Sequence, residues 1–195
     1  MTTPDLAPAA RLTASVVRHV RDDELDSPTP CPQMPVRGLL AHLDGLSLAF
    51  GAAARRDLGP LTDTPPDNDG PPALADGWRE RIPVALESLA AAWAEPDAWQ
   101  GMTRAGGVDL PGEVAGLVAL DEVVLHGWDL AAATAQDYRP DDTTAQVVLG
   151  FLTESRTQPV PEDLFGPVVH VTSAATPFER ALGLAGRDPL WGTVT

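Results

Sequence analysis

The chain of 195 residues contains no lysine, and all 13 of its basic side chains are arginines. Without lysine, the protein cannot be an enzyme that forms a Schiff base through lysine, nor one that uses a P-loop lysine. Isoleucine and asparagine occur only at Ile82 and Asn68. Because the codons of lysine, isoleucine and asparagine are all AT-rich, we infer a gene from a high-GC bacterial genome.

Cysteine is also scarce. The single thiol, Cys31, cannot form a disulfide within the chain, and residues 1–20 lack the basic-then-apolar order of a signal peptide. The sequence has no apolar run long enough to span a bilayer. We therefore expect a cytoplasmic protein with no membrane partner.

Positive charge is in short supply as well. The 28 acidic residues outnumber the basic ones and leave a net charge of −15, which repels a phosphate backbone, so we expect no nucleic-acid partner. Hydrophobic residues make up 44% of the chain and charged residues 21%, a globular composition at a length that suits one domain.

Apolar residues recur at helical spacing in several segments. The pattern predicts five helices, over Leu6–Arg21, Val36–Arg56, Ala73–Ala94, Glu113–Gln136 and Asp141–Glu154. Pro83 lies inside the third and predicts a kink there. These segments indicate an all-α fold, a four-helix bundle with an additional helix.

The remaining segments are rich in proline and glycine. Residues 59–72 predict an exposed loop without chemistry, and residues 99–112 predict a short hairpin that connects rather than packs. Near the end, residues 168–171 predict one short strand and residues 178–184 a last helical turn or two that ends at Gly186. We expect residues 1–157 to form the bundle and residues 158–195 to form a C-terminal tail packed on it.

The fourth predicted helix carries the clearest candidate site. Glu122 and His126 lie four residues apart and project from one face that also carries Val118 and Leu125. A carboxylate directed toward a core needs a partner or a metal ion to offset its desolvation. His42 lies on the apolar side of the second predicted helix, so two adjacent helices can direct all three side chains to one point.

Two imidazoles and one carboxylate, with positions left for water or substrate, form the ligand set of a catalytic zinc site. The same set suits non-haem Fe(II). The alternative from the residues alone is a buried Glu122–His126 pair without a metal ion.

Three motifs resemble the mycothiol-dependent maleylpyruvate isomerase metal-binding family of DinB-like helical bundles. They are Thr29–Leu43 (TPCPQMPVRGLLAHL), Ala119–Leu130 (ALDEVVLHGWDL) and Leu184–Pro189 (LAGRDP), the last resembling a common ending of the family's short actinobacterial members. One departure is Met34, where the family often has tryptophan, so the packing under the second helix is expected to differ.

The resemblance implies that His42, Glu122 and His126 ligate a divalent metal ion, zinc first, with nickel or iron as alternatives. It also implies an enzyme in which the metal activates a low-molecular-weight thiol, mycothiol in an actinobacterial host, toward a small electrophile. An isomerase and a thiol S-transferase both fit, and the chain is expected to be a monomer or homodimer. Two other readings stay open: a non-catalytic metal- or ligand-binding module with a regulatory or stress role, and a helical interaction protein without metal.

Several further residues have two interpretations each. Asp129 lies three residues after His126 and either orients that imidazole or is a solvated helix carboxylate. Three arginines either clamp a substrate carboxylate or form surface ion pairs: Arg37, Arg180 and Arg187.

Other reactive or aromatic side chains receive no catalytic role. Cys31 has no basic neighbour in the sequence to stabilise a thiolate, so we expect it to pack in its loop. His19 and His170 have no second ligand at useful spacing. Four tryptophans are expected to line the core or a pocket: Trp78, Trp93, Trp99 and Trp128.

Overall fold

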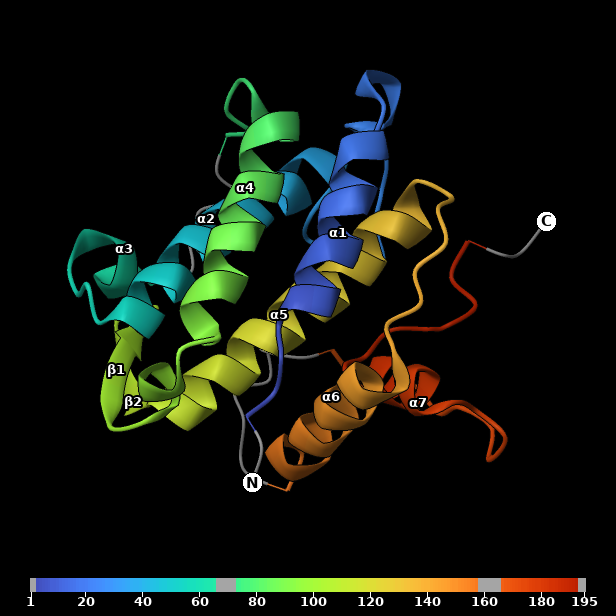
Figure 1. The fold of residues 1–195 in the computed structure, drawn as a ribbon. Coiled ribbons are helices and arrows are strands. Elements are labelled where there is room, and N and C mark those ends of the chain that lie inside the picture. The colour runs from blue at the N-terminus through green and yellow to red at the C-terminus, as the bar shows by residue number, and fades with distance from the viewer. Residues whose placement is uncertain (1–2, 66–72, 158–165, 193–195) are drawn as a thin grey trace.

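The computed structural model describes residues 3–65, 73–157 and 166–192. Four long helices form a bundle in which α1 and α2 each pack against both α4 and α5, so that one core lies between them (Figure 1). Their bounds are Ala7–His19 for α1, Val36–Arg55 for α2, Trp78–Trp93 for α4 and Gly112–Ala133 for α5. The predicted all-α bundle is confirmed.

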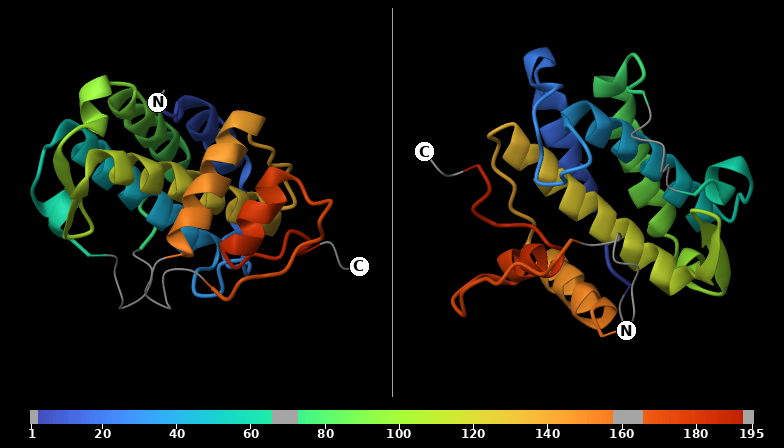
Figure 2. Two further views of the ribbon diagram at one scale, coloured as in Figure 1. Left: turned by 90° about the horizontal axis from the view of Figure 1, so that it is seen from below. Right: turned by 180° about the vertical axis from the view of Figure 1, so that it is seen from behind.

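The helix α5 is the most enclosed element. Its own apolar residues are spread over all of its faces, which is typical of a helix with neighbours on several sides. The helices α1 and α2 pack against it, and α6 covers another side (Figure 2). Polar side chains on such a helix need internal partners. This requirement singles out its acidic residues and its histidine.

The approach of α1 to α5 depends on Gly127. A Cβ at this position would lie 2.3 Å from Thr13 Oγ1 and 2.7 Å from the hydroxyl of Tyr138. The Thr13 hydroxyl donates to the Val123 carbonyl at 3.0 Å and is hydrogen-bonded to Tyr138 at 3.0 Å. The missing side chain therefore gives room to a buried hydroxyl pair.

The predicted hairpin is present, as β1 (Met102–Ala105) and β2 (Val108–Pro111), paired antiparallel. Gly106 and Gly107 connect the strands at φ 59° and 77°, the left-handed conformations of a tight hairpin turn. The expectation that this segment only connects is wrong, because the buried Thr103 donates to the Ala53 carbonyl at the end of α2.

Two other predicted segments differ from the structure. Within the expected loop 59–72, residues Pro60–Asp63 form one helical turn, α3, held by Thr62 Oγ1 and the Gly59 backbone; residues 66–72 lie outside the described chain. The third of the predicted helices corresponds to α4. It begins at Trp78 and not at Ala73, directly after Gly77, which has φ 70°. Short 3-10 turns occur at Asp22–Glu24 and Pro96–Trp99.

After α5, the helices α6 (Asp142–Ser155) and α7 (Pro177–Leu184) pack against each other beside the bundle (Figure 2). The strand expected at residues 168–171 is not formed. Within the described ranges, this segment makes one backbone hydrogen bond, from the Val169 N–H to the Gly183 carbonyl. The predicted boundary between 157 and 158 abuts residues outside the described chain, and the division stays a prediction.

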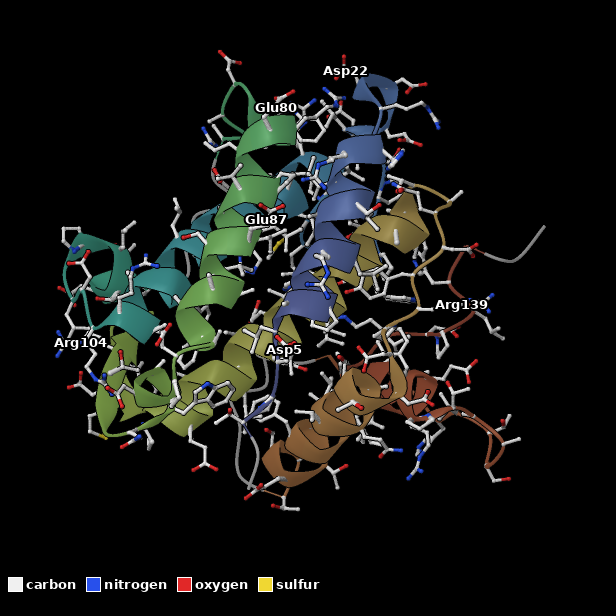
Figure 3. All side chains as sticks on the ribbon, viewed as in Figure 1. Asp5, Asp22, Glu80, Glu87, Arg104 and Arg139 are labelled. Atoms are coloured by element: carbon white, nitrogen blue, oxygen red, sulfur yellow. The ribbon has the colours of Figure 1, made fainter. Side chains whose placement is uncertain are left out.

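Many of the charged side chains lie on the outer faces of the protein. Glu80 and Glu87 project outward from α4, and Asp5, Asp22 and Arg139 are likewise exposed (Figure 3). No helix in the described ranges is both long and apolar enough to cross a membrane.

Candidate metal centre

The side chains of His42, Glu122 and His126 meet between α2 and α5. Both imidazoles direct Nε2 to the same oxygen, Glu122 Oε2, at 3.1 Å from His42 and 3.2 Å from His126. One potential ligand atom from each residue lies within 4.8 Å of the other two, and the two imidazole rings meet edge to face at 4.7 Å. The three residues selected by helical spacing are therefore brought together.

This cluster is open on one side. The side chains of His42 and Glu122 are 25% and 26% exposed, whereas that of His126 is 10% exposed. The cluster is therefore partly exposed to solvent through His42 and Glu122, whereas His126 is the most buried of the three side chains.

Charge on the three side chains follows from their mutual contacts. Burial raises the pKa of Glu122, but the hydrogen bonds from His126 and His42 outweigh it and hold that pKa well below its usual range. Burial lowers the pKa of His126, but hydrogen bonds to Asp129 and Glu122 reverse this and raise it to about 9. Without a metal ion, an ionised carboxylate and an imidazolium therefore share the site.

Asp129 contacts His126 at Nδ1, the ring nitrogen that does not face Glu122. Its side chain is fully buried, and Oδ2 lies 3.0 Å from Nδ1 of His126. A carboxylate at Nδ1 retains the proton there and leaves the Nε2 lone pair for a metal ion. Of the two interpretations of Asp129, orientation of the imidazole is the one that the geometry supports.

Arg187 approaches Asp129 from the C-terminal segment. Its Nε and Nη2 donate to Asp129 Oδ1 and Oδ2 at 3.3 and 2.9 Å, and its Nη1 donates to the Ala185 carbonyl at 2.7 Å. Only 9% of the residue is exposed, so the expected surface ion pair is instead a buried one. The spacing of residues in the sequence does not predict this contact, because 58 residues separate Arg187 from Asp129.

The other proposed arginine clamps lie apart from this arrangement. Arg37 forms an exposed ion pair with Asp26 at 2.7 Å, which agrees with its surface interpretation, and Arg180 is exposed on α7. The exposed His19 bonds to the Ser15 carbonyl of its own helix, and His170 is exposed. Neither histidine joins the cluster of possible metal ligands found among the described residues.

Cys31 has surroundings that the sequence did not predict. Burial and the charge of Asp129 raise the pKa of its thiol, although Arg187 is near enough to act in the opposite direction. The thiol is therefore protonated at neutral pH, which agrees with a packing role. The four tryptophans expected in the core or a pocket are all buried.

Asp121 was not selected from the sequence. It is 3% exposed, and its Oδ1 has no hydrogen-bond partner among the described residues. Burial, and then the charge of Glu122, raise the pKa of this carboxyl well above its ordinary value. The fold thus disfavours the charged form of the carboxyl directly before the candidate ligand on α5.

The donor set fits a divalent metal ion. Two imidazole nitrogens and one carboxylate oxygen are ordinary ligands of zinc and of non-haem iron, and the carboxylate behind His126 is the partner that metal-bound histidines commonly have. The three donor groups already face one another, as a shared ion requires.

The sequence relationships agree with the motifs. Residues 6–131 match the family model described as mycothiol maleylpyruvate isomerase N-terminal domain. The chain belongs to this family. The matched region contains His42, Glu122 and His126, whereas Arg187 lies beyond it.

The chain is also similar to two curated proteins in sequence and to one solved structure in fold. An uncharacterized protein from each of two Mycobacterium tuberculosis strains is 30% identical over 128 residues, which is 63% of this chain and 62% of the relative. The match thus spans less than two thirds of these relatives. A crystal structure of a histidine-to-alanine mutant of mycothiol-dependent maleylpyruvate isomerase has the same fold, at TM-score 0.61 and 19% identity over 87% of this chain and 78% of the other.

Proposed function

We propose that the protein is a divalent-metal enzyme that uses a low-molecular-weight thiol, mycothiol in its host, to isomerise or to add sulfur to a small electrophile. In the isomerisation, the thiolate forms a C–S bond to an activated cis alkene, and the π electrons move to the neighbouring carbonyl oxygen. The former double bond, now a single bond, rotates, and elimination then breaks the C–S bond and returns the thiolate and the trans alkene. In the transfer, the adduct takes up a proton and is the product. Zinc is the expected metal.

The observation that carries this proposal is the convergence of His42, Glu122 and His126. Membership of the family supports the thiol, and the relatives from Mycobacterium tuberculosis support an actinobacterial host. A divalent ion bound there supplies a Lewis acid that lowers the pKa of a coordinated thiol.

The chain's own residues prepare this site. Glu122 provides the negative charge, and Asp129 retains the Nδ1 proton of His126 so that Nε2 is available. The side chains of His42 and Glu122 are 25% and 26% exposed, so solvent molecules and ligands can contact part of the cluster. Structural zinc sites normally have four protein ligands, so an open cluster of three favours a catalytic role.

A thiol screen tests the proposed activity. The metal-loaded protein is offered mycothiol, glutathione or no thiol, with maleylpyruvate and a panel of other electrophiles, and His42→Ala serves as the metal-deficient control. We expect turnover that requires both the thiol and an intact His42. Metal binding without thiol-dependent turnover on any substrate would replace this proposal with a non-catalytic metal-binding module.

A further inference from the structure

The C-terminal segment reaches the metal centre through a specific chain reversal after α7. The Gly186 N–H bonds to the Gly183 carbonyl and the Arg187 N–H to the Leu182 carbonyl at 2.9 Å, while Gly186 has φ 79°. These are the two hydrogen bonds and the left-handed residue of a Schellman motif. The motif turns the chain at the point where Arg187 must point back toward α5.

Glycine is required in this turn for a second reason. A Cβ on Gly186 would lie 2.8 Å from backbone atoms of Gly166. The reversal is therefore fixed by backbone conformation and by close packing, and it directs the arginine into a buried position.

All three nitrogens of the Arg187 guanidinium donate a hydrogen bond. Nε and Nη2 form a two-pronged contact with the Asp129 carboxylate, and the Ala185 carbonyl accepts from Nη1. Planar two-pronged pairs fix the orientation of a carboxylate better than a point charge does. The carboxylate so fixed is the one that contacts Nδ1 of His126.

We infer that Arg187 is a positioning residue for the metal centre, which acts through Asp129 to hold His126 with Nε2 directed at the metal site. The inference rests on the proposed function, because it requires that His126 ligates a metal ion. It makes the segment beyond residues 6–131 part of the site, although the family model ends before it.

The metal affinity of the apo-protein tests this inference. It is measured by competition with a chelator and by the visible spectrum of bound Co²⁺. Loss of an outer partner of a metal-bound histidine typically lowers affinity by about 10- to 100-fold, and we expect a loss in this range for Arg187→Gln. Arg187→Lys keeps the charge without the two-pronged contact and is expected to fall between. Arg139→Gln, on an exposed arginine (Figure 3), is the matched control and should bind as wild type does.

A double-mutant cycle separates positioning from general support of the fold. If Arg187 acts through Asp129, Arg187→Gln lowers affinity in the wild-type background but has little further effect in an Asp129→Asn background. Equal losses in both backgrounds would overturn the inference, as would an Arg187→Gln protein that is folded by circular dichroism and binds Co²⁺ within twofold of wild type. If Arg187→Gln does not fold, the same cycle is run with Arg187→Lys.

The inference and the proposed function fail in different ways. A wild-type protein that binds no divalent ion would sink both. A wild-type protein that binds the ion normally, with Arg187→Gln unchanged, would sink the role of Arg187 alone.

Discussion

Metal binding should depend steeply on pH, because His126 must lose a proton before Nε2 can coordinate. Burial lowers the pKa of this imidazole, but its contacts with Asp129 and Glu122 raise it to about 9, against 6.5 for an ordinary histidine. Below this pKa the site holds a proton that competes with the metal ion. The affinity should therefore rise with pH, and the rise should continue to about pH 9.

The size of the effect follows from the fraction of neutral imidazole. Between pH 6 and pH 8, a group of pKa about 9 increases its neutral fraction by about 90-fold, whereas a group of pKa about 6.5 increases it only by about 4-fold. If the pKa of His126 is about 9, nearly one proton should leave the protein at pH 7 for each metal ion bound.

Chelator competition at several pH values measures the affinity, and calorimetry in buffers of different ionisation enthalpy counts the proton. Asp129→Asn is the control variant, because loss of the negative charge at Nδ1 lowers the pKa of His126 and flattens the pH dependence. An affinity that changes by less than about 5-fold over pH 6 to 8, with no proton released at pH 7, would refute this reasoning.

Two predictions concern the bundle itself and are measured by urea unfolding. Gly127→Ala places a methyl group against Thr13 and Tyr138 and should lower the free energy of unfolding by about 1–3 kcal/mol, whereas Gly150→Ala, on the open face of α6, should raise it by about 0.5–1 kcal/mol. Equal effects would contradict the packing described. Asp121 should take up a proton on folding, because burial raises its folded pKa well above that of the unfolded chain, and stability is then lost as pH rises above the unfolded value. Asp121→Asn should therefore be more stable than wild type at pH 7, with a gain that shrinks toward pH 4; a gain independent of pH would argue against a neutral carboxyl.

The sequence predicts the bundle because the apolar period of each long helix is regular. The same regularity predicts the centre, since helical spacing alone places Glu122 and His126 on one face and puts His42 on the apolar side of its helix. The sequence-based prediction is wrong where local hydrogen bonds determine the secondary structure. The single turn at Pro60–Asp63 depends on the Thr62 hydroxyl, and proline-rich composition conceals it.

Contacts over long sequence separations account for what the sequence did not predict. Nothing near Asp129 in the chain indicates that an arginine 58 residues away neutralises it. The available signal was Gly186 directly after a helical segment, since glycine at a helix end commonly reverses the chain. That signal places a turn, but only the packed structure shows which carboxylate Arg187 then meets.

The divalent ion held by His42, Glu122 and His126 is the central claim, and elemental analysis tests it most directly. Purified protein loaded with zinc and freed of excess should retain about one ion per chain, as a single three-ligand site requires. His42→Ala and Glu122→Gln should lose it, whereas His19→Ala, which removes an exposed histidine bonded only within α1, should keep it. Wild-type protein without bound zinc, or His42→Ala protein with wild-type zinc content, would contradict the account.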